Sequence, residues 1–274
     1  MLSTSTIARA PARRLIGGML VCAAVTLAGG APAAEAPRQR AVPLGDGAEV
    51  AVRVFPARGR ELIVWLPSEG SQAATDEQIA AQLARIGIEV WLADVINARF
   101  LPELRSSLDE IPGADVAAVI AAAAASGKRV YLLSAGRGAL PALRGARTWQ
   151  LDRPRDQALA GAILLWPNLY VTTPEPGADA EYLPVVRETR LRIYILQPQL
   201  SPWYWRLERL RAELQGAGSV VLTKVLPGVR DRFYFRSEYA VIEGPVREDE
   251  LAGEFPEMLR EAVTQLNPKP SSVR

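Results

Sequence analysis

Short apolar runs alternate with helix-like segments along most of this sequence, and this alternation limits the fold more than any other feature. The run at 61–66 suits a strand that is buried on both faces of a parallel sheet. In the following segment, 75–85, Ile79 and Leu83 share one helical face and Thr75 is the expected N-cap. Further strands are predicted at 49–55, 88–93, 129–133, 160–166, 191–196 and 220–226, and further helices at 102–109, 114–125, 139–144, 204–215 and 248–266. The pattern predicts an α/β fold with one doubly wound, mostly parallel sheet and helices on both faces.

The N-terminus has the order of features that is typical of a secretory signal peptide. Three arginines precede an uncharged apolar run at 15–27, and small residues follow it around Ala33. The run is shorter than the roughly 20 apolar residues that span a bilayer. We therefore predict a Sec-type signal peptide over residues 1–34. A twin-arginine signal at Arg13-Arg14 and a lipoprotein acylated at Cys22 are the less favoured alternatives.

Export and cleavage would leave a periplasmic or secreted protein without a membrane span. We expect a polar lead-in at 35–48, a single domain at 49–268 and a disordered tail at 269–274. Near-equal numbers of basic and acidic residues, 32 against 30, give no sign of a nucleic-acid partner.

The absence of one residue type excludes several kinds of chemistry. The chain contains no histidine, and its single cysteine, Cys22, lies inside the expected signal peptide. Ser-His-Asp catalysis, Cys-His catalysis and ordinary zinc sites are therefore excluded from the exported protein. Only oxygen ligands remain, and no EF-hand loop is present. We predict neither a metal site nor a cofactor.

The segment Ser134-Ala135-Gly136-Arg137-Gly138 follows a predicted buried strand and precedes a helix of small residues. This strand, turn and helix resemble the nucleophile elbow, G-x-S-x-G, of the α/β-hydrolase superfamily. The resemblance covers about 49–266 and implies an α/β-hydrolase-like fold. In this frame Gly136 stands where the nucleophile would be, so the small residues of the turn are kept and the reacting atom is absent.

The other two catalytic positions of the superfamily are also changed. The stretch 197–202, after the strand that should precede the catalytic acid, contains no carboxylate. The loop after the last strand keeps Leu226-Pro227-Gly228, but Arg230, Asp231 or Arg232 stands where the resemblance implies a histidine. The segment 88–100 and this loop also resemble the periplasmic VirJ virulence-protein branch.

The loss of all three positions favours a pseudoenzyme, because a serine hydroxyl needs an adjacent base to act as a nucleophile. We expect a ligand-binding or protein-binding scaffold module of the cell envelope. The alternative is an esterase-like hydrolase with non-standard catalytic residues, drawn from Ser134, Asp94 and Asp231. A structural accessory domain without a pocket is a third hypothesis.

Aromatic and basic residues cluster at the ends of the predicted strands. In the predicted fold these loops share one edge of the sheet, and we expect them to form a cleft. Such a cleft suits an anionic or sugar-like ligand, or an envelope protein. Packing of the helix starts and local ion pairs would explain the same residues without a ligand. The predicted ligand-binding residues are Arg137, Trp166, Asn168, Tyr170, Trp203, Tyr204, Arg230 and Arg232.

Overall fold

A computed structural model describes residues 35–175, 177–234 and 247–267. The expected signal peptide, with its arginine pair and Cys22, and the expected tail at 269–274 lie outside the described residues. Within the described part, none of the helices has the length and apolar character needed to cross a bilayer.

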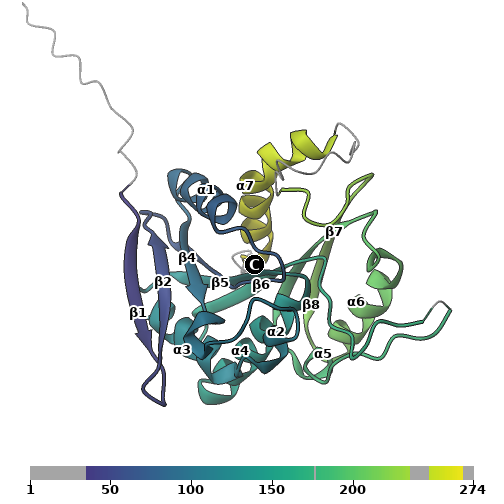
Figure 1. Cartoon of the computed structure of the whole chain (residues 1–274), viewed down its shortest axis with the longest axis horizontal. Helices are drawn as coiled ribbons and strands as arrows, with labels where there is room; N and C mark the ends of the chain where they lie inside the picture. The colour runs from purple at the N-terminus through teal and green to yellow at the C-terminus, as the bar shows by residue number, and fades with distance from the viewer. Residues whose placement is uncertain (1–34, 176, 235–246, 268–274) are drawn as a thin grey trace, which may run out of the picture. The chain divides into compact units, whose positions relative to one another are not determined.

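The described residues form one eight-stranded sheet with the order β1-β2-β4-β3-β5-β6-β7-β8 (Figure 1). Strand β2 runs antiparallel to both of its neighbours, β1 and β4, and all the other neighbouring strands run parallel. This arrangement confirms the predicted doubly wound, mostly parallel sheet. The strands are β1 (Arg38–Pro43), β2 (Glu49–Phe55), β3 (Glu61–Trp65), β4 (Glu89–Asp94), β5 (Arg129–Ala135), β6 (Leu159–Leu165), β7 (Arg192–Pro198) and β8 (Val220–Leu226).

Helices cover both faces of the sheet, because each helix has an apolar stripe to bury. Figure 1 shows α1 and α7 on one side and α3 and α4 on the other. Leu83 of α1 and Phe255 of α7 belong to one buried cluster, whereas Ile120 of α3 and Leu143 of α4 belong to a second. The helices are α1 (Ala73–Arg85), α2 (Ser107–Glu110), α3 (Gly113–Ala124), α4 (Ala139–Asp152), α5 (Val185–Glu188), α6 (Leu207–Gly216) and α7 (Arg247–Leu266), with short 3-10 turns η1 (Asn97–Arg99), η2 (Gly136–Gly138) and η3 (Tyr204–Arg206).

The largest difference from the sequence prediction is at the start of the sheet. The segment expected as a polar lead-in contains β1, which pairs with β2 in continuous register. Most of β1 is exposed and only Val42 is buried, so its pattern lacks the alternation that identifies a strand. Pro43 ends the strand at the edge of the sheet, where a missing backbone donor is tolerated.

Helix boundaries also differ from the prediction, and α2 begins only at Ser107, so 102–106 of the segment predicted as a helix at 102–109 is not helical. Helix α1 begins at Ala73 with Gln72 as the preceding residue, so Thr75 lies inside the helix and does not cap it. Helix α4 continues to Asp152, well beyond residue 144. Its Pro141 lies in the first turn, where a missing N–H group costs no helical hydrogen bond.

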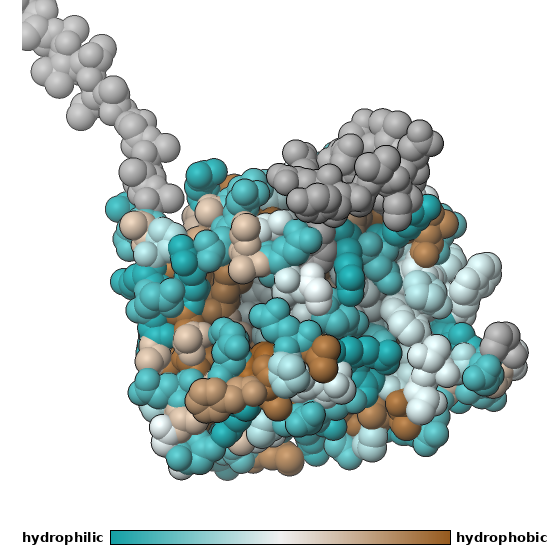
Figure 2. Space-filling model, viewed as in Figure 1, coloured by the Kyte–Doolittle hydropathy of each residue, from teal (hydrophilic) through white to brown (hydrophobic). Residues whose placement is uncertain are grey.

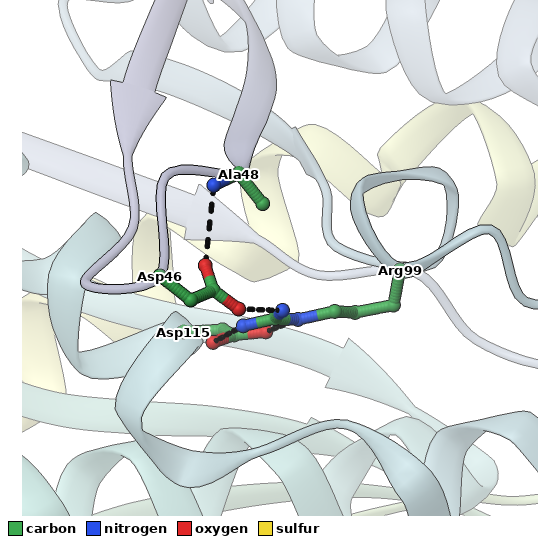
Figure 3. A network of polar contacts seen from close by, with 4 residues as sticks. All are labelled: Asp46, Ala48, Arg99 and Asp115. Atoms are coloured by element: carbon green, nitrogen blue, oxygen red, sulfur yellow. Dashed lines mark hydrogen bonds and ion pairs between the residues drawn. The ribbon is translucent and has the colours of Figure 1, made fainter.

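An ion-pair network connects three segments that are distant in the sequence (Figure 3). Arg99 of η1 donates from Nε and Nη2 to the buried carboxylate of Asp115 in α3, at 2.5 and 2.6 Å. Its Nη1 also pairs with Asp46 in the β1–β2 turn. The hydrogen bond from Arg99, followed by that from the Ala48 N–H, lowers the pKa of Asp46. The network fixes η1 beside the carboxyl end of β4.

Candidate functional site

The turn after β5 has the sharp geometry that the sequence resemblance implies. Gly136 has a φ of 53°, in the left-handed region that favours glycine. At Gly138 a Cβ atom would lie 2.1 Å from Ser134 Oγ and 2.4 Å from the Pro67 carbonyl oxygen. These distances leave no room for a side chain, so the two glycines allow the strand and α4 to meet closely.

A carboxylate that the sequence analysis did not identify lies directly over this turn. A Cβ atom on Gly136 would be 2.4 Å from Oε1 of Glu69 and 2.9 Å from its Oε2. The backbone N–H of Arg137 donates to Glu69 Oε2 at 2.8 Å. In the hydrolase resemblance, the N–H after the nucleophile belongs to the oxyanion hole. Glu69 therefore occupies the space next to the position from which a nucleophilic side chain would project.

The loop after β8 brings further charged groups to the same place. Arg232 donates from Nη2 to the Glu69 carbonyl oxygen at 3.0 Å, and its guanidinium lies against Gly70. Burial raises the pKa of Asp231 to about 6, although a hydrogen bond with Ser201 opposes the shift. Ser201 follows β7, so the loops after β7 and β8 meet here. Glu69 also contributes to the raised pKa of Asp231 through its charge.

A cavity of about 370 Å³ lies at the carboxyl ends of β3 and β4. Such a volume falls within the usual range for small-molecule sites. Glu69 and Asp94 line the cavity, together with Asp76 from the first turn of α1. Glu69, whose carboxylate lies over Gly136, is therefore part of the cavity wall.

Asp94 is the one sequence-predicted catalytic candidate that reaches this cavity. Its carboxylate also accepts hydrogen bonds from the Asn97 N–H at 3.1 Å and from Asn97 Nδ2 at 2.7 Å. It caps the loop that leads into η1. Neither Ser134 nor Asp231 is among the lining residues, so the structure does not bring the three candidates together around the cavity.

Ser134 has no exposed surface, and its hydroxyl donates to the Pro67 carbonyl oxygen at 3.4 Å. This placement fits a small turn residue. It leaves no accessible oxygen for attack on a substrate.

Asp76 is an unusual group in the cavity wall. The residue is 8% exposed, and its Oδ1 atom is buried without a hydrogen-bond partner among the described residues. Burial alone raises the pKa of its carboxyl to about 7. An uncompensated buried carboxylate is costly, so the fold favours the protonated form.

Asp76 should therefore make the protein less stable as the pH rises. The pKa in the folded state is raised above its usual value, so the folded state binds more protons than the unfolded state between about pH 4 and pH 7. We expect Asp76→Asn to increase the free energy of unfolding at pH 8 by about 1–3 kcal/mol, with a smaller gain at pH 5. Urea unfolding at both pH values measures this, with the exposed Asp152→Asn as control. Equal pH dependence in wild type and Asp76→Asn would contradict it.

The predicted ligand-binding residues do not line a common cleft as expected. Arg137 is buried and donates to both carboxylate oxygens of Asp109, with the Nη2–Oδ2 distance 2.7 Å, and to the Tyr170 carbonyl oxygen at 2.6 Å. Tyr170 is itself buried, with its ring centroid 5.3 Å from that of Trp203. These contacts hold the elbow and the segment after β6, and they leave little of Arg137 or Tyr170 for a ligand.

The remaining members of that set also make contacts within the protein or lie away from the cavity. Trp166 is buried, with its ring 5.8 Å from that of Tyr234. The Asn168 N–H donates to the Gly136 carbonyl oxygen at 2.9 Å. None of the eight predicted residues, including Tyr204, Arg230 and Arg232, lines the 370 Å³ cavity.

The described residues contain no group of three or more acidic, histidine or cysteine side chains that could hold a metal ion. Figure 2 shows one face of the molecule, where hydrophilic residues predominate and hydrophobic residues form separate patches. A broad apolar docking area is therefore not seen on this face.

No protein-family model and no curated protein sequence matches the chain. Solved structures do match. An esterase of Pyrobaculum calidifontis has a TM-score of 0.58 and 15% identity, over 82% of this chain and 86% of that one. Thermogutta terrifontis esterase 2, phosphorylated by paraoxon, has a TM-score of 0.58 and 16% identity, over 85% and 96%. A thermophilic carboxylesterase, EstE1, cloned from a metagenomic library has a TM-score of 0.57 and 15% identity, over 86% and 90%.

At this level of identity the likeness shows the fold, which is that of the α/β-hydrolase esterases. It also corrects the functional expectation from the sequence. The pseudoenzyme scaffold was inferred from the missing serine, acid and histidine, but the three structures named above are esterases. The hydrolase alternative fits these neighbours better.

Proposed function

We propose that this protein is an ester hydrolase in which carboxylates and an arginine take the place of serine, acid and histidine. One observation carries the proposal: the Glu69 carboxylate lies over Gly136, held by the Arg137 N–H, where the fold would otherwise position a nucleophile. The likeness to esterase structures supports a hydrolytic reaction.

In this proposal Glu69 is a general base and water is the nucleophile. Glu69 takes a proton from a water molecule while the water oxygen attacks the ester carbonyl carbon. The Arg232 guanidinium, next to the Glu69 backbone, stabilises the developing oxyanion. Protonated Asp231 gives its proton to the departing alkoxide oxygen as the acyl–oxygen bond breaks. The products are a carboxylic acid and an alcohol, and exchange with solvent restores both carboxyl groups.

The decisive experiment is hydrolysis of a panel of p-nitrophenyl esters by the purified protein, together with a fluorophosphonate probe. We expect hydrolysis above the buffer rate without covalent labelling, because no serine is the nucleophile. Absence of hydrolysis across the panel between about pH 4 and pH 8 would overturn the proposal. A labelled serine would overturn its mechanism.

The proposal also predicts an acidic pH optimum. Burial raises the pKa of Asp231 to about 6, so the carboxyl is mostly protonated below that pH and loses its proton above it. As a proton donor to a departing alkoxide it should make kcat/KM for an ester of a simple alkyl alcohol fall about tenfold per pH unit above pH 6. Asp231→Asn should lower kcat/KM and remove this alkaline decline, whereas Asp152→Asn should retain it. A rate that rises through pH 6 in the wild type would contradict the assigned role.

Three expectations from the sequence stay predictions: export through the signal peptide, a periplasmic location and a relationship to the VirJ branch. They would place the reaction in the cell envelope, but the assignment of Glu69, Asp231 and Arg232 does not depend on them.

A further inference from the structure

The cavity at β3 and β4 combines apolar walls with a marked excess of acidic side chains. Trp65, Leu92 and Ile96 contribute apolar surface. Five of the described residues that line the cavity are acidic, and the one basic residue in this described lining, Arg53, already pairs with Glu77 at 3.2 Å. A recess lined by one sign of charge concentrates ligands of the opposite sign.

Most of the acidic groups have partners within the protein. Glu77 pairs with Arg53, Glu69 accepts from the Arg137 N–H, and Asp94 accepts from Asn97. Asp76 differs because it is more than nine-tenths buried and its Oδ1 atom has no partner among the described residues. Buried polar groups in folded proteins are nearly always hydrogen-bonded, so an unpaired one calls for an explanation.

We propose that this cavity binds a small organic cation, with an alkylammonium group on Asp76 and a short carbon chain against Trp65 and Leu92. The ammonium group would supply the missing donor and a compensating charge at once. An anion would be repelled by the same side chains, and a neutral alcohol would leave the carboxylate uncompensated. The raised pKa of Asp76 agrees with this, because burial without a partner favours the protonated form over the bare carboxylate.

Glu69 lines the same cavity. The ammonium group would therefore be part of the ester substrate, and its contact with Asp76 would position the ester next to Glu69. This step rests on the proposed function and specifies the substrate class: esters that carry a primary amine. Binding of the cation itself does not depend on turnover.

The test is calorimetric titration of the full chain with n-butylammonium, n-butanol and butyrate. We expect n-butylammonium to bind about tenfold more tightly than n-butanol, and butyrate not to bind. Asp76→Asn keeps the size of the side chain and should weaken n-butylammonium binding about tenfold while leaving n-butanol unchanged. The matched Asp152→Asn variant, exposed at the end of α4, should bind like the wild type.

Equal affinity for n-butylammonium and n-butanol would overturn the inference, as would no binding of n-butylammonium or an unchanged affinity in a folded Asp76→Asn protein. Circular dichroism melting establishes that each variant is folded. The two proposals fail separately. Cation binding without ester hydrolysis would overturn the proposed function alone, and hydrolysis without Asp76-dependent binding would overturn the cation site alone.

Discussion

Glu69→Gln is expected to lower kcat/KM for ester hydrolysis by about 10²–10⁴-fold, the usual contribution of a positioned general base. Glutamine has nearly the same shape as glutamate, and its carbonyl oxygen can still accept the hydrogen bond that the Arg137 N–H donates to Oε2 at 2.8 Å. The amide cannot take a proton from water at any relevant pH. The expected loss is therefore a loss of proton transfer, and it should appear mainly in kcat.

The measurement is the steady-state rate at pH 5 on the best ester of the panel, with the exposed Glu110→Gln as the matched control. The control should have wild-type rates. A folded Glu69→Gln protein with more than about a third of wild-type kcat/KM would exclude Glu69 as the base, since general-base catalysis contributes much more than that.

Asp109→Ala is expected to destabilise the fold by about 3 kcal/mol. Arg137 is 4% exposed and directs Nε and Nη2 to the Asp109 carboxylate. Removing that carboxylate leaves a buried guanidinium whose remaining hydrogen bond is to the Tyr170 carbonyl oxygen. Asp109 is itself partly exposed, so water can reach the guanidinium once the carboxylate is removed. The expected loss in free energy of unfolding is therefore smaller than the largest values seen for fully buried ion pairs.

Urea unfolding of wild type, Asp109→Ala and Glu110→Ala measures this loss. Glu110 is the next residue in α2 and is exposed, so its replacement should change the free energy of unfolding by less than about 0.5 kcal/mol. Similar stabilities for the two variants would show that the Arg137–Asp109 pair contributes no more than a surface ion pair.

The sheet could be predicted from the sequence because its buried strands have an unambiguous pattern. β3, β5, β6 and β7 are short apolar runs, and helices with apolar stripes separate them. The elbow was also predictable, since Gly136 and Gly138 follow a buried strand directly. β1 could not be predicted, because an exposed edge strand buries little and so carries no apolar alternation.

The carboxylates of the site could not be found in the same way. Glu69 lies in an irregular segment after β3, and its position over a turn 67 residues later is a property of the tertiary fold. Asp76 had the sequence context of an ordinary acidic residue in a first helical turn, which is favourable at the surface. Its burial depends on the strands and loops that pack against α1.

Arg137 illustrates the opposite case. Its position in the fold was predicted correctly, but its role was not. It lies at the elbow, as expected, but its guanidinium joins the elbow to α2. A buried structural arginine and a ligand-binding arginine look the same in a sequence. The group that pairs with the guanidinium in the folded protein distinguishes the two roles. Here the partner, Asp109, comes from a four-residue helix that has no strong sequence pattern of its own.

The close approach of Glu69 to Gly136 restricts the order in which these two positions can change. Any side chain at 136 would place its first carbon 2.4 Å from Glu69 Oε1. A serine introduced there by a single substitution has no space until residue 69 is shortened or turned away. Ancestral reconstruction or directed evolution between a serine esterase and this protein must therefore move the Glu69 carboxylate aside, or shorten residue 69, before serine enters. In the other direction, the serine must leave before the glutamate carboxylate lies over the turn.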